Sequence, residues 1–88
     1  MFDKKSLGKR IKEVRKVKGF TQERLAESVS IDPKHLSRIE CGINSPSLDL
    51  LNKISVALDI EPYLLFQTIQ DKPKEVLIQN ILGLKSIK

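Results

Sequence analysis

The stretch 22-QERLAESVSIDPKHLSRIEC-41 decides the fold, because it encodes two short helices and the turn that joins them. Leu25, Ala26 and Val29 share one face of the first helix, and Leu36 and Ile39 share one face of the second. These apolar groups can meet in one core only if the helices cross steeply over a short connection. The stretch therefore predicts an angled helix pair, not a single broken helix.

The turn contains residues that favour the start of a new helix. Asp32 is a favoured N-cap residue, and Pro33 suits the first helical position, where a missing N–H costs nothing. Ile31 is the apolar residue expected to fill the turn. Ser30 stands where such a turn favours glycine, and a left-handed backbone at a non-glycine residue costs roughly 1 kcal/mol. We therefore expect a left-handed, slightly strained residue at position 30.

Helical apolar spacing continues on both sides of this motif. The side chains expected to face the core there are Leu7, Ile11, Val14, Val17, Leu48, Leu51, Ile54, Ala57, Leu58, Leu65, Phe66 and Ile69. Residues 6–69 are therefore expected to form one all-α domain of five short helices without a strand. Residues 70–88 are expected to be a linker followed by an apolar, helical tail, which either dimerises or folds onto its own domain.

Composition excludes several classes of function. The chain has 88 residues, enough for one small domain, and a net charge of +5. Residues 1–20 hold eight Lys/Arg and two acids (net +6), which suits a polyanion such as nucleic acid or an anionic membrane. Cys41 and His35 are the only residues of their types and form no evident dyad or metal-ligand set. We expect no enzyme activity, no catalytic residues, no cofactor and no metal, and the sequence contains no apolar run long enough to span a membrane.

Four segments of the chain resemble a known family. They are 8-GKRIKEVRKVKGFTQERLAESVSI-31, 36-LSRIECG-42, 46-PSLDLLNKISVALDI-60 and Leu65-Phe66. The order of their apolar positions, the Thr21-Gln22 opening and the Arg38-Ile39-Glu40-x-Gly42 ending are similar to Cro/C1-type (XRE family) helix-turn-helix DNA-binding domains. The resemblance covers about residues 6–66 and implies a lambda-repressor-like fold.

The resemblance also implies DNA contacts. The second helix of the motif would lie in the major groove, and its outward residues would contact bases: Pro33, Lys34, His35, Ser37 and Arg38. Phosphate contacts would come from helix starts, from the loop after the motif, which would present backbone N–H groups, and from the first helix: Thr21, Gln22, Ile43, Asn44, Ser45, Lys9 and Arg10. Arg15 and Glu40 would form a structural ion pair. Relatives often carry lysine in the loop after Gly42, so Ile43 and Asn44 suggest weaker phosphate affinity on that side.

The function implied is a sequence-specific, double-stranded DNA-binding transcription regulator, a cytoplasmic and nucleoid-associated homodimeric repressor that binds a partly palindromic operator. The candidate dimer contacts are Tyr63, Phe66, Leu77, Ile81 and Leu84. Three alternatives stay open at this point. The domain could belong to a restriction–modification controller, to an antitoxin whose tail binds a toxin, or to a protein-interaction module without DNA binding.

Overall fold

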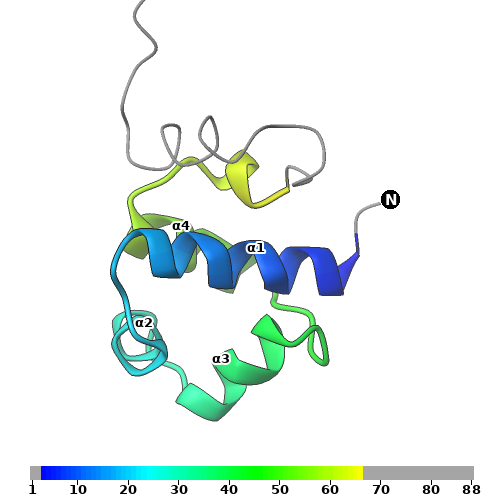
Figure 1. Ribbon diagram of the computed structural model, residues 1–88, viewed down its shortest axis with the longest axis horizontal. Coiled ribbons are helices and arrows are strands. Elements are labelled where there is room, and N and C mark those ends of the chain that lie inside the picture. Colours follow the sequence, from blue (N-terminus) through cyan, green and yellow to red (C-terminus); the bar gives the residue numbers. More distant parts are fainter. Residues whose placement is uncertain (1–2, 67–88) are drawn as a thin grey trace, which may run out of the picture.

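The computed structural model describes residues 3–66 and shows an all-helical domain (Figure 1). Its elements are α1 (Lys4–Val17), α2 (Gln22–Ser28), α3 (Pro33–Glu40), α4 (Leu48–Leu58) and the 3₁₀-helix η1 (Pro62–Phe66). No strand occurs within these residues, as the sequence predicts. None of the helices in this part of the chain is long and apolar enough to cross a membrane.

Each α-helix begins at a side chain that accepts a hydrogen bond from a backbone N–H of the first turn. The four N-caps are Asp3, Thr21, Asp32 and Ser47, with oxygen–nitrogen distances of 2.9–3.1 Å. A cap of this kind satisfies one of the N–H groups that a helix start leaves unpaired. The positions where the sequence signals helix starts are therefore the positions where the helices start.

The core lies where all four α-helices and η1 meet. Its fully buried aliphatic members include Ile11, Leu25, Leu36, Ile54 and Leu65. The prediction that Leu48 points inward is wrong, because Leu48 is the first residue of α4 and 81% of its surface is exposed. Leu50 takes the corresponding core position. Val17 and Ala57 are only half-buried and pack at the edge of this core.

The turn between α2 and α3 has the backbone that the sequence predicts. Ser30 has a φ of 61°, in the left-handed region, and the Ile31 N–H donates to the Ala26 carbonyl over 2.9 Å. A second left-handed residue, Asp59 (φ 58°), ends α4. The left-handed backbone at Asp59 was not predicted, since aspartate also serves as a helix cap or turn residue with ordinary φ values.

The fifth helix is a five-residue 3₁₀-helix and not an α-helix. Within it Leu64 and Leu65 are buried, but Phe66 is 44% exposed, so the prediction that Phe66 faces the core is wrong. The expected inward position of Ile69, and the expected linker and tail over 70–88, lie outside the described residues.

Candidate nucleic-acid interface

Helix α3 separates its buried side chains from its outward ones. Leu36 and Ile39 are fully buried against the core. The five side chains expected to contact bases all lie on this helix, three exposed and two half-buried: Pro33, Lys34, Arg38, His35 and Ser37. The outward side of the helix is thus mostly polar and carries two cations, and its apolar side packs against the core.

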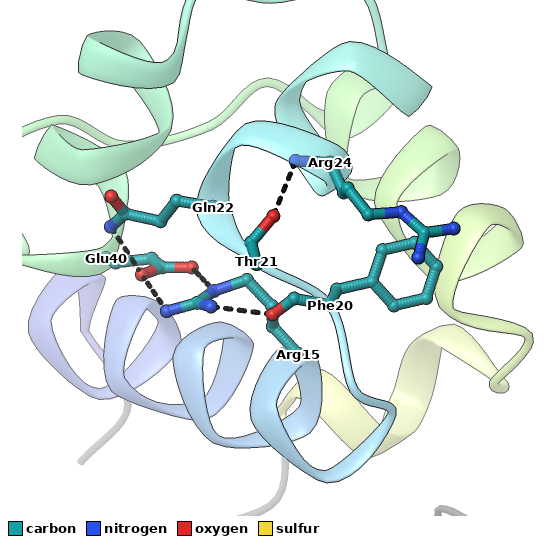
Figure 2. Close-up of polar contacts among 6 residues, drawn as sticks. All are labelled: Arg15, Phe20, Thr21, Gln22, Arg24 and Glu40. Carbon is teal, nitrogen blue, oxygen red and sulfur yellow. Dashed lines mark hydrogen bonds and ion pairs between the residues drawn. The ribbon is translucent and has the colours of Figure 1, made fainter.

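A buried polar network ties the end of α3 to α1 (Figure 2). Arg15 donates to Glu40 through Nε (2.7 Å to Oε2) and Nη2 (3.2 Å to Oε1), so the guanidinium and the carboxylate meet in a bidentate pair. Arg15 Nη1 also donates to the Phe20 carbonyl over 2.8 Å. Both side chains are more than nine-tenths buried. The structure thus brings together the two residues for which the resemblance implied an ion pair.

Gln22 belongs to the same network. Its Nε2 donates to Glu40 Oε1 over 2.9 Å, so the side chain points toward the ion pair (Figure 2). An amide nitrogen carries two N–H groups, and one bond to Glu40 leaves the second for another acceptor. Gln22 is half-buried at the start of α2, beside the exposed N-cap Thr21. The contact with Glu40 was missed from the sequence, because it joins residues 18 apart on different helices.

Arg24 adds a cation to the outer surface of α2. Its guanidinium carbon lies 5.3 Å from the centroid of the Phe20 ring, within the range of a cation–π interaction (Figure 2). The side chain is exposed. The connection between α1 and α2 is therefore held on both sides of Phe20, at its carbonyl by Arg15 and at its ring by Arg24.

Helices α1 and α3 approach each other at Gly8. A Cβ built there would overlap the Ile39 carbonyl oxygen and lie 2.9 Å from the Glu40 carbonyl oxygen. Only glycine leaves room for this backbone-to-backbone contact. The sequence contained one usable signal, a glycine inside an otherwise regular helical pattern, which usually has a packing reason.

Of the two α1 residues expected to contact phosphate, one is exposed and the other is buried. Lys9 is exposed, but Arg10 is only 1% exposed, and its Nη1 lies 3.8 Å from Glu13 Oε1. Burial lowers the pKa of the Arg10 guanidinium, and the Glu13 carboxylate opposes that shift. The phosphate role expected for Arg10 is therefore corrected to a role inside the domain.

The loop between α3 and α4 was expected to present backbone N–H groups. Instead, the N–H groups of Ile43 and Asn44 both donate to the Arg38 carbonyl, over 2.9 and 3.3 Å. They close the end of α3, as backbone donors after a helix often do. Ile43 and Ser45 are exposed and Asn44 is half-buried. The phosphate contact expected from the backbone of Ile43 and Asn44 is therefore not supported, and of the two side chains only the amide of Asn44 has a donor.

The same loop receives a cation that the sequence did not single out. Lys4 Nζ, from the first residue of α1, donates to the Ile43 carbonyl over 3.1 Å. Beside it, Gly42 (φ 80°) touches Lys5, since a Cβ built on Gly42 would lie 2.8 Å from the Lys5 Cα. Lys4 and Ile43 are 39 residues apart in sequence, so no local pattern could have revealed this bond.

Comparison with known proteins identifies the family to which a domain of this geometry belongs. A family model described as helix-turn-helix (HTH_3) matches residues 11–65, more than half of the chain. The chain belongs to the Cro/C1-type helix-turn-helix family. In this helix-turn-helix domain the motif consists of α2, the left-handed turn at Ser30, and α3.

Two relatives with established names align with the domain. The HTH-type transcriptional regulator SinR of Bacillus subtilis is 38% identical over 60 residues, which is 67% of this chain and 54% of SinR. The HTH-type transcriptional regulator ImmR of the same organism is 37% identical over 76 residues, 85% of this chain and 60% of ImmR. The chain thus spans between half and three-fifths of the length of these curated relatives.

Solved structures share the fold of this helix-turn-helix domain. The restriction-modification controller protein C.AhdI from Aeromonas hydrophila matches with a TM-score of 0.68 and 39% identity, over 70% of this chain and 94% of C.AhdI. The hypothetical transcription factor NHTF from Neisseria matches with a TM-score of 0.72 and 26% identity, over 77% of this chain and 78% of NHTF. The named relatives are transcription regulators and a controller protein, and none of these names describes an enzyme.

The remaining expected site residues of the helix-turn-helix domain fall into two groups. Tyr63 and Phe66 are 60% and 44% exposed on η1 and are accessible for a partner. Leu77, Ile81 and Leu84 lie outside the described residues. Within residues 3–66 no three His, Cys, Asp or Glu side chains group as metal ligands, and Cys41 is a free, exposed thiol.

Proposed function

We propose that this chain is a sequence-specific, double-stranded DNA-binding transcription regulator that acts as a homodimeric repressor in the cytoplasm. The observation that carries the proposal is the outward surface of α3 in a domain of this family. Lys34 and Arg38 are four residues apart on this surface, and both can donate to the O6 and N7 acceptors of guanine.

The size of α3 suits this role. An α-helix with its side chains is about 10–12 Å in diameter, and the major groove of B-DNA is about 12 Å wide and admits one such helix. Pro33, Lys34 and His35 lie toward the N-terminal end of α3, where helices of this kind contact bases. Thr21, Gln22, Lys9 and Ser45 would contribute phosphate contacts around it. In this arrangement the base contacts determine the sequence specificity, and the phosphate contacts position the protein on the DNA.

A homodimer follows from the small number of base pairs that one such helix can contact. Two copies of α3 about one DNA turn apart would give useful affinity on a partly palindromic operator. Tyr63 and Phe66, with Leu77, Ile81 and Leu84, are the proposed dimer contacts. Light scattering on the full chain and on a chain ending at Gln70 tests the tail, because an unchanged mass would remove residues 71–88 from the dimer.

Selection of sites from a random DNA pool, followed by fluorescence anisotropy with the full chain, tests DNA binding. We expect a selected site with two-fold symmetry and an affinity that falls steeply as salt rises. Arg38→Ala should cost about 1–3 kcal/mol on that site and much less on unrelated DNA. Lys53→Ala is the matched control, because Lys53 pairs with Asp49 on α4 over 3.7 Å. No binding to any fragment at low salt would instead favour a protein-interaction module.

One observation favours a more specific biological role. C.AhdI, a restriction-modification controller protein, aligns over 94% of its length at 39% identity. We propose as a second candidate that this chain controls a restriction–modification operon. A restriction enzyme and a methyltransferase encoded beside it, with the selected DNA site upstream of them, would support this role. A toxin gene in that position would favour the antitoxin alternative.

A further inference from the structure

We propose that Lys4, at the start of α1, is a DNA phosphate contact that acts at the loop between α3 and α4. The inference rests on the proposed function and adds a residue that neither the motif nor the helix-turn-helix comparison assigns. It concerns the ammonium group of the side chain, and not the N–H groups of the helix start.

The first observation is the position of the ammonium group. Lys4 Nζ donates to the Ile43 carbonyl over 3.1 Å, and the side chain is exposed. An ammonium has three N–H donors, and this bond uses one of them. The Lys4 ammonium therefore places a positive charge on the outer side of the loop and still has N–H donors for another acceptor.

The second observation is the state of the loop itself. The N–H groups of Ile43 and Asn44 are bonded to the Arg38 carbonyl and do not face outward. An anion at this loop would therefore meet the Lys4 ammonium instead of these two backbone donors. The contact between Gly42 and Lys5 keeps the first turn of α1 against the loop, so the two form one surface.

The third observation is an electrostatic cost. The first turn of α1 holds Lys4 and Lys5 and no acid, although the positive end of a helix dipole disfavours cations. The N-cap Asp3 offsets part of this repulsion. A departure of this kind from local electrostatic preference is more common at functional positions than elsewhere.

The fourth step is geometric. If α3 lies in the major groove, the two sugar–phosphate backbones flank it, and the chain that leaves its C-terminal end must pass beside one of them. The loop that follows Glu40 is in that place, and Lys4 is bonded to an exposed residue of this loop, Ile43.

The test measures how the DNA affinity of the full chain depends on salt. The magnitude of the slope of log K against log[salt] should fall by about 0.9 in Lys4→Ala, on selected and unrelated DNA alike. Lys4→Met keeps the aliphatic stem and should show the same loss, and Lys4→Arg should restore the slope. Lys53→Ala should leave the slope unchanged.

The outcomes separate the possible explanations. An unchanged slope in Lys4→Ala and Lys4→Met, with or without lower thermal stability, would overturn the inference and leave Lys4 as a structural link to the loop. The proposed function would survive that result, because the wild-type chain would still bind DNA. Absence of salt-dependent DNA binding in the wild-type chain would instead overturn the proposed function, and this inference with it.

Discussion

Replacing Glu40 by glutamine tests what the buried network contributes to stability. The change leaves the Arg15 guanidinium buried without its carboxylate and removes the charge from the three hydrogen bonds that Glu40 accepts, two from Arg15 and one from Gln22. Breaking a buried ion pair from one side costs about 3–5 kcal/mol, and a hydrogen bond kept by the new amide oxygen returns about 1 kcal/mol. We expect Glu40→Gln to lower the free energy of unfolding by about 3 kcal/mol, a large share of the stability of so small a domain.

Urea unfolding of the full chain, followed by circular dichroism, measures this loss. For a domain of this size it corresponds to a fall in Tm of at least about 12 °C. Glu27→Gln is the control, since Glu27 is exposed on α2 and its change should stay within about 0.5 kcal/mol. The double change Arg15→Met with Glu40→Leu should recover much of the loss, because it leaves no unpaired buried charge. A Glu40→Gln chain as stable as the wild type would refute the structural role of the pair.

Two further changes test the turn and the first helix cap. Ser30→Gly should raise the free energy of unfolding by about 1 kcal/mol, because Ser30 is left-handed, whereas Ser28→Gly in α2 should lower it by about the same amount; a loss in both would contradict the explanation. The hydrogen bond from the Ser6 N–H, helped by the Ser6 side chain, lowers the pKa of Asp3 below its ordinary value of 3.8. The Asp3 carboxylate therefore stabilises the domain above that pH and stops doing so as the pH falls through its folded pKa. Relative to Asp3→Asn, which keeps an accepting oxygen, the wild-type chain should lose Tm in that acid range, and a difference in Tm that is independent of pH would argue against the cap.

Most of the fold was predictable because its signals are local. Caps such as Asp32 and Ser47 mark helix starts, and the spacing of Leu25, Leu36 and Ile39 marks the faces that meet in the core. The left-handed Ser30 was predictable from its place in the turn. These features depend on a few neighbouring residues, which a sequence shows directly.

The wrong predictions came from assigning single side chains to a face. Leu48 is apolar, but at the first position of α4 it lies off the face that Leu51 and Ile54 bury. Arg10 is charged, yet it lies three residues after Leu7 and four before Val14 and so shares their buried face. In both cases residue type was given more weight than position on the helix, and position decided the outcome.

The tertiary parts of the site were not predictable in this way. The bond between Gln22 and Glu40, the link from Lys4 to Ile43 and the inward-turned N–H groups of the loop all depend on how α1, α2 and α3 are placed in space. No spacing rule connects residues on different helices. The resemblance supplied only the Arg15–Glu40 pair.

The close approach of α1 and α3 at Gly8 has a consequence for changing DNA specificity. The attachment of α3 uses backbone atoms and inward side chains, and none of these is an outward residue such as Lys34 or Arg38. The angle at which α3 packs against α1 should then not depend on which side chains occupy the outward positions. A library randomised at those positions, with Gly8 and Glu40 kept, should consist mostly of folded proteins that differ in sequence preference. The same separation would let a natural lineage acquire a new operator through a few substitutions without rebuilding the domain.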